Sequence, residues 1–96
     1  MNTLYIFTKS PWARRDMEDW LPRLDPQDGV LLIQDAVLAL KGAPAGVRET
    51  LQGLQGRLFA LEADLVARGI AAGKARIVDD AVAVDLLATH DRVLAL

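Results

Sequence analysis

The fold is decided by a short segment near the start of the sequence, Thr3-Leu4-Tyr5-Ile6-Phe7-Thr8, which runs directly into Lys9-Ser10-Pro11-Trp12. Four consecutive apolar residues rich in β-formers are typical of a strand that is covered on both faces of a sheet. Ser10 is suited to cap a helix, and Pro11 to occupy its first position, where a missing N–H costs nothing. We therefore expect a central strand over residues 3–8 and a helix over residues 11–24.

The same alternation continues along the chain. Apolar runs predict further strands over residues 30–33, 57–61 and 75–78, with residues 92–96 as a fifth strand or a docked tail. Helical patterns cover residues 36–41, with Asp35 at the cap, then 47–54, 62–68 and a last helix after Asp79 and Asp80. Gly69 is expected to close the third of these helices in a left-handed conformation. In the last helix the apolar residues are expected to face inward, namely Val82, Val84, Leu86 and Leu87.

Strands alternating with helices indicate parallel pairing. The predicted fold is α/β, a small three-layer sandwich with a mostly parallel four- to five-stranded sheet, in one domain spanning residues 1–96. The composition agrees, since 96 residues with 52% apolar residues are enough for one core. No window approaches a membrane span, and the first residues lack a secretion signal, so we expect a cytoplasmic protein.

Two features of the composition exclude classes of function. The chain has no cysteine, which excludes disulfides, thiolate metal sites and any persulfide chemistry carried by this chain itself. Its 11 basic and 13 acidic residues give a net charge of -2, with neither half strongly basic. Direct nucleic-acid binding is therefore not expected.

Any site is expected where the carboxyl ends of parallel strands meet, around residues 8–12, 34–35, 61–64 and 79–80. The first of these segments lacks the glycines of a dinucleotide-binding loop, although Lys9 and nearby amides offer a weak anion site. Three aspartates after two of the predicted strands offer a cation site, Asp35, Asp79 and Asp80, although the first strand supplies no carboxylate. Helix capping and pairing with the helix dipole explain Asp35 and Asp80 without any metal, and this explanation is preferred. His90 is the only histidine and is placed near a helix end, so we expect no catalytic residue, no metal and no cofactor.

The position of Trp12 in the sequence is compatible with two roles. An indole directly after a Ser-Pro pair lies at the rim of the sheet, where tryptophans often anchor an interface or a loop. It is equally suited to the core. Both roles stay open.

Several segments, in this order and spacing, resemble the TusB/DsrH family over essentially the whole chain. They are Ser10-Pro11-Trp12, Leu31-Leu32-Ile33-Gln34-Asp35, Phe59-Ala60-Leu61 and Asp64-Leu65-Val66-Ala67-Arg68-Gly69-Ile70, with Asp79 and His90 at similar places. The likeness implies a DsrE-like fold and a complex with TusC-like and TusD-like subunits, a heterohexamer with two copies of each. Such complexes pass persulfide sulfur toward tRNA wobble 2-thiouridine, or toward dissimilatory sulfur oxidation. The resemblance places the reactive thiol on the TusD or DsrE partner.

Without a thiol, the chain is predicted to be a non-catalytic structural subunit of a TusBCD/DsrEFH-type sulfurtransferase complex. Its expected interface at the rim comprises Ser10, Pro11, Trp12, Gln34 and Asp35. The chain departs from the family pattern at Ala36, at the Gly-Ala-Pro-rich residues 42–46 and in its Leu-Ala-Leu ending, which leaves the surface of residues 42–56 and the C-terminal contacts open. Two alternatives remain, a stand-alone anion- or metal-binding α/β domain and a homo-oligomeric scaffold.

Overall fold

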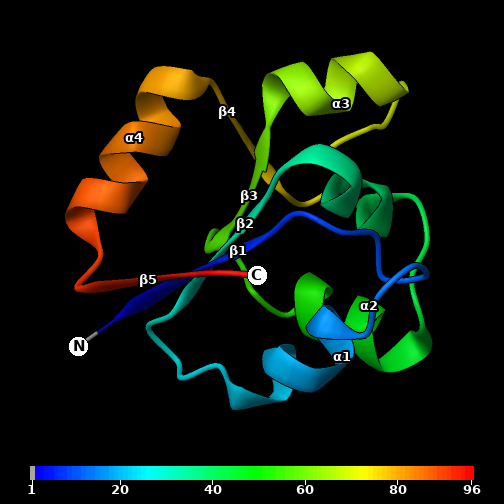
Figure 1. Ribbon diagram of the computed structural model, residues 1–96, viewed down its shortest axis with the longest axis horizontal. Helices are drawn as coiled ribbons and strands as arrows, with labels where there is room; N and C mark the ends of the chain where they lie inside the picture. Colours follow the sequence, from blue (N-terminus) through cyan, green and yellow to red (C-terminus); the bar gives the residue numbers. More distant parts are fainter. Residues whose placement is uncertain (1) are drawn as a thin grey trace.

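The computed structural model describes residues 2–96 and contains one parallel sheet in the order β4-β3-β2-β1-β5. Its strands are β1 (Thr3–Phe7), β2 (Gly29–Leu32), β3 (Leu58–Leu61), β4 (Arg76–Val78) and β5 (Arg92–Ala95). Figure 1 shows β5 running beside β1, so the first and last strands of the chain are neighbours in the sheet. The predicted α/β fold is confirmed, and residues 92–95 are a strand rather than a docked tail.

The helices lie on both faces of this sheet. They are α1 (Asp16–Trp20), α2 (Ala45–Gln52), α3 (Glu62–Arg68) and α4 (Asp80–Thr89), with two 3₁₀ helices, η1 (Leu21–Arg23) and η2 (Gln34–Leu40). The chain steps through β1, β2, β3 and β4 in one direction along the sheet and then returns to β5. Because crossovers between parallel strands are right-handed, the last connection must cross the opposite face from the first three. The last connection contains α4, so α4 is the helix that covers this second face of the sheet.

Two apolar cores follow from this division. The larger lies under α1, α2, η2 and α3, and includes Tyr5 and Phe7 of β1 and Leu65 of α3. The smaller lies under α4 and centres on Leu4 and Val78. Successive residues of β1 point to opposite cores, so the strand is covered on both faces as the sequence indicates.

The continuous helix predicted over residues 11–24 is wrong. The Ser10 hydroxyl does accept a hydrogen bond from the Ala13 N–H at 3.1 Å, but this bond closes a turn, and α1 begins only at Asp16 without a side-chain cap. The α-helix stops at Trp20 and continues as η1. Pro22 explains this end, because it has no N–H to donate to the carbonyl four residues earlier.

The segment after β2 also differs from the prediction. Residues 34–40 form a 3₁₀ helix whose cap is Ile33, so Asp35 is not a capping residue. The next helix lies two residues earlier than expected, at Ala45–Gln52. In contrast, α3 has the predicted bounds, and Gly69 ends it with a φ of 62°, in the left-handed region that glycine tolerates.

The expectation for α4 is wrong in most of its inward residues. Val82, Val84 and Leu87 are 42%, 62% and 43% exposed, and no residue of the helix is fully buried. Leu86 alone of the four predicted residues packs against the smaller core, together with Ala83. At about 100° per residue, a helix cannot turn residues 82, 84, 86 and 87 to one side. The cap is Asp79 rather than the predicted Asp80, because Asp79 Oδ1 accepts a hydrogen bond from the Val82 N–H at 2.9 Å and Asp80 is the first residue of the helix.

Candidate functional site

Trp12 lies on the surface at the rim of the sheet. Its side chain is 68% exposed, which excludes the core role. The indole Nε1–H donates a hydrogen bond of 3.0 Å to the carbonyl oxygen of Gly42, thirty residues further along the chain. Trp12 therefore links the loop after β1 to the Gly-Ala-Pro-rich segment.

Ser10 and Pro11 are buried and shape this loop from within. The Ser10 carbonyl oxygen accepts hydrogen bonds from the N–H groups of Ala13 and Arg14, both at 3.2 Å. Its hydroxyl accepts from the Ala13 N–H as well. Both polar groups thus have partners within the turn that presents Trp12.

Gln34 and Asp35 are held by α3. The Gln34 N–H donates a hydrogen bond to Asp64 Oδ2 at 2.7 Å, and Gln34 itself has a φ of 51°, in the left-handed region. Arg68 binds Asp35 Oδ1 through Nε and Nη2, each at 3.0 Å, and reaches Asp64 Oδ1 at 3.4 Å. One guanidinium therefore joins two carboxylates, and the whole network ties the start of η2 to α3.

The structure thus divides the five predicted rim residues between two supports. The loop of Ser10, Pro11 and Trp12 is fixed to residue 42, whereas Gln34 and Asp35 are fixed to α3. Both segments begin at the ends of neighbouring strands, since the Ile33 N–H donates to the Phe7 carbonyl at 3.1 Å. Both segments therefore lie at the carboxyl ends of the strands, on the same side of the sheet, as expected.

The other polar residues considered from the sequence are not gathered there. Asp79 caps α4, and Asp35 is paired with Arg68, so the cation site considered for Asp35, Asp79 and Asp80 is not assembled. Residues 2–96 contain no group of three His, Cys, Asp or Glu side chains arranged to hold a metal ion. His90 lies at the end of α4, as predicted, and its Nδ1–H donates to the Leu86 carbonyl at 2.7 Å.

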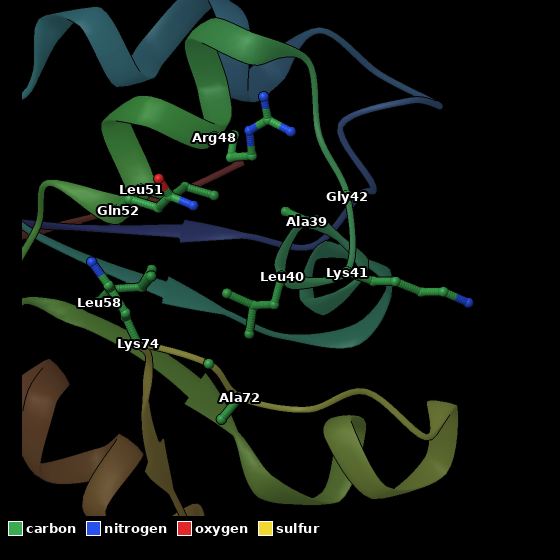
Figure 2. A pocket seen from close by; sticks show the side chains of 11 residues that line it. Ala39, Leu40, Lys41, Gly42, Arg48, Leu51, Gln52, Leu58, Ala72 and Lys74 are labelled. Carbon is green, nitrogen blue, oxygen red and sulfur yellow. The ribbon is translucent and has the colours of Figure 1, made fainter.

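The sequence does not predict a cavity that lies beside this end of the sheet. It has a volume of about 220 Å³ and lies between η2, α2 and the segment before β4 (Figure 2). Its wall includes Gly42, the residue that accepts the Trp12 hydrogen bond. One part of its lining could be read from the sequence, because the spacing of four residues puts Arg48 and Gln52 on the same side of α2. Nothing in the sequence shows that residues 72–74 lie opposite this side of the helix.

No helix within residues 2–96 is long and apolar enough to cross a membrane. Among known protein families, a family model described as DsrH like protein matches residues 9–93, which include all five rim residues. No curated protein matches the chain.

Proposed function

The chain belongs to the DsrH-like family, whose members are subunits of multi-protein sulfur-relay complexes, and from this we propose that it is a structural subunit of a TusBCD/DsrEFH-type sulfurtransferase complex. The complex would relay persulfide sulfur for 2-thiouridine synthesis at the tRNA wobble position. The proposed partners are TusC-like and TusD-like subunits in a heterohexamer. Such a complex would work in the cytoplasm.

The proposed role is non-catalytic because the chain contains no cysteine. A persulfide is carried on a thiol sulfur, and no other side chain accepts sulfane sulfur in this way. The thiol would come from the TusD-like partner. The chain would supply a shaped surface, with Ser10, Pro11, Trp12, Gln34 and Asp35 as the part proposed to face a partner.

The exposed apolar residues of α4 are the observation that carries the assembly role. Val82, Val84 and Leu87 on this helix, and Val93 on the neighbouring β5, are all at least 42% exposed. In Figure 1, α4 stands apart from α1 and α2, which cover the other face of the sheet. Exposed apolar side chains gathered on one element are typical of an interface that a partner subunit covers.

Native mass spectrometry of the complex isolated at natural expression levels tests the assembly. We expect three kinds of small subunit, two copies of each. Val84→Asp should release this chain from the complex, because a carboxylate would be buried without a partner at the interface. Val66→Asp is the matched control, since Val66 is 75% exposed on α3 and belongs to the other layer. Finding this chain alone, or an intact complex with Val84→Asp, would contradict the proposal.

The pathway is tested separately in cells that lack the chain. Nucleoside analysis of tRNA should show loss of wobble 2-thiouridine and its return with the wild-type gene. Unchanged 2-thiouridine together with lost oxidation of reduced sulfur compounds would assign the complex to dissimilatory sulfur metabolism instead.

A further inference from the structure

The cavity beside the rim has a floor made of aliphatic side chains. Leu51 and Leu58 line it and are 4% and 2% exposed, and Ala39, which is 5% exposed, lies beside them. Leu40 is partly buried and projects into the centre of the view in Figure 2. A ligand with an apolar body would therefore remove aliphatic surface from water on entering.

The mouth of the cavity carries positive charge only. Its lining residues include Lys41, Arg48 and Lys74 but no aspartate or glutamate. Within residues 2–96 the salt bridges involve Arg15 and Arg68, so none of these three cations is paired with a carboxylate. A local excess of unpaired cations attracts anions and raises the affinity for them.

Two of the cations border the cavity from different elements of the fold. Figure 2 shows Arg48 on the α2 side of the cavity with its guanidinium turned outward, and Lys74, from the segment before β4, with its amine beside Leu58, whereas Lys41 extends away on the other side of Leu40. Gln52 lines the same wall one helical turn after Arg48 and adds an amide donor. The hydrogen-bond donors thus lie around the mouth of the cavity, and the aliphatic groups form its floor.

From this arrangement we propose that the cavity binds a small organic anion. The carboxylate or phosphate head of the ligand lies between Arg48 and Lys74, and its short apolar body lies on Leu40, Leu51 and Leu58. A volume of about 220 Å³ suits a compact ligand rather than a polymer. The lining has no aromatic residue on which a nucleobase would stack. This site is independent of the proposed role in sulfur relay.

Fluorine NMR of para-fluorobenzoate tests the site on the protein in the form in which it purifies. We expect saturable broadening of the ligand signal with a roughly millimolar Kd, as the small number of ligand atoms allows. Hexanoate should compete, because it has both an apolar body and a carboxylate. Acetate has only the head and para-fluorobenzyl alcohol only the body, so each should bind far more weakly.

Charge variants locate the binding. Arg48→Gln and Lys74→Gln should each weaken binding about three- to tenfold, since each removes one charge-assisted contact in a partly exposed site. Lys9→Gln, which removes an exposed cation outside the cavity, is the control and should leave the Kd unchanged. No saturable binding, an equal effect of the control, or equal binding of the alcohol and the carboxylate would each overturn the proposal. Circular dichroism confirms that the variants keep their fold.

Discussion

Asp28 fixes the start of the sheet, and replacing it gives the largest stability effect that the structure predicts outside the apolar core. Its side chain is almost completely buried, and Oδ1 accepts a hydrogen bond from the Thr3 N–H at 2.8 Å. Oδ2 accepts another from the Asp25 N–H at 2.9 Å. The carbonyl of Asp28 also accepts a bond of 2.6 Å from Arg57 Nη1. One residue thus joins the turn before β2 to both β1 and the start of β3.

The expected cost of Asp28→Ala follows from these bonds. Thr3 is buried, so its N–H would lose its partner without gaining water, at about 2 kcal/mol in the free energy of unfolding. Asp25 is exposed, so water would replace the second bond and that loss would add at most about 1 kcal/mol. A total of about 3 kcal/mol lowers the Tm of a chain of this size by on the order of 15 °C.

Urea denaturation followed by tryptophan emission measures this loss. Asp28→Asn keeps one acceptor oxygen and should cost about half as much as Asp28→Ala. Asp25→Ala is the matched control from the same turn, because only the backbone of Asp25 takes part, and it should change stability by less than about 0.5 kcal/mol. If Asp28→Ala were no more destabilising than this control, the hydrogen bonds of the Asp28 side chain would not stabilise the start of the sheet as argued.

Three further predictions concern the backbone and the rim. Gln34→Gly should stabilise the chain by up to about 1 kcal/mol because residue 34 has a φ of 51°, and calorimetry showing a lower Tm would contradict this reading of strain. Gly29→Ala should lower the Tm, since its Cβ would lie 3.0 Å from His90 Nε2, whereas Gly46→Ala, which meets nothing within 4 Å, should raise it slightly. Arg68→Met should cost about 1 kcal/mol in urea titrations at low ionic strength and less in high salt, and a loss independent of salt would argue against an ion-pair origin.

The strands were predictable because their signal is local and strong. Two fully apolar runs, residues 4–7 and 30–33, identify the strands that are covered on both faces, and both occupy the interior of the sheet. Helix α3 was predicted to its exact bounds because a glycine in the left-handed conformation ends it. Helix α1 was not, because the Ser-Pro start signal is satisfied by a single turn and Pro22 breaks the later part of the pattern.

The site was less predictable than the fold because its contacts join distant segments. The sequence places Trp12 and Asp35 at the correct edge of the sheet, but not their partners Gly42 and Arg68, which lie about thirty residues away in each case. The cavity depends on packing between α2 and the segment before β4. No sequence motif marks these long-range contacts or the packing that forms the cavity. The outward residues of α4 were misassigned because its apolar residues surround the helix rather than forming one stripe.

The pairing of β5 with β1 has a consequence for biosynthesis. The two strands are joined across almost the whole sequence, with Asn2 bonded to Asp91 and Thr8 to Leu96. Translation must therefore pass residue 92 before β1 gains its second neighbour, and loop closure over so long a separation is slow. Until then the nascent polypeptide carries an open strand edge of the kind that promotes aggregation. Truncation before that point should leave a fragment that depends on chaperones, however intact its first four strands are.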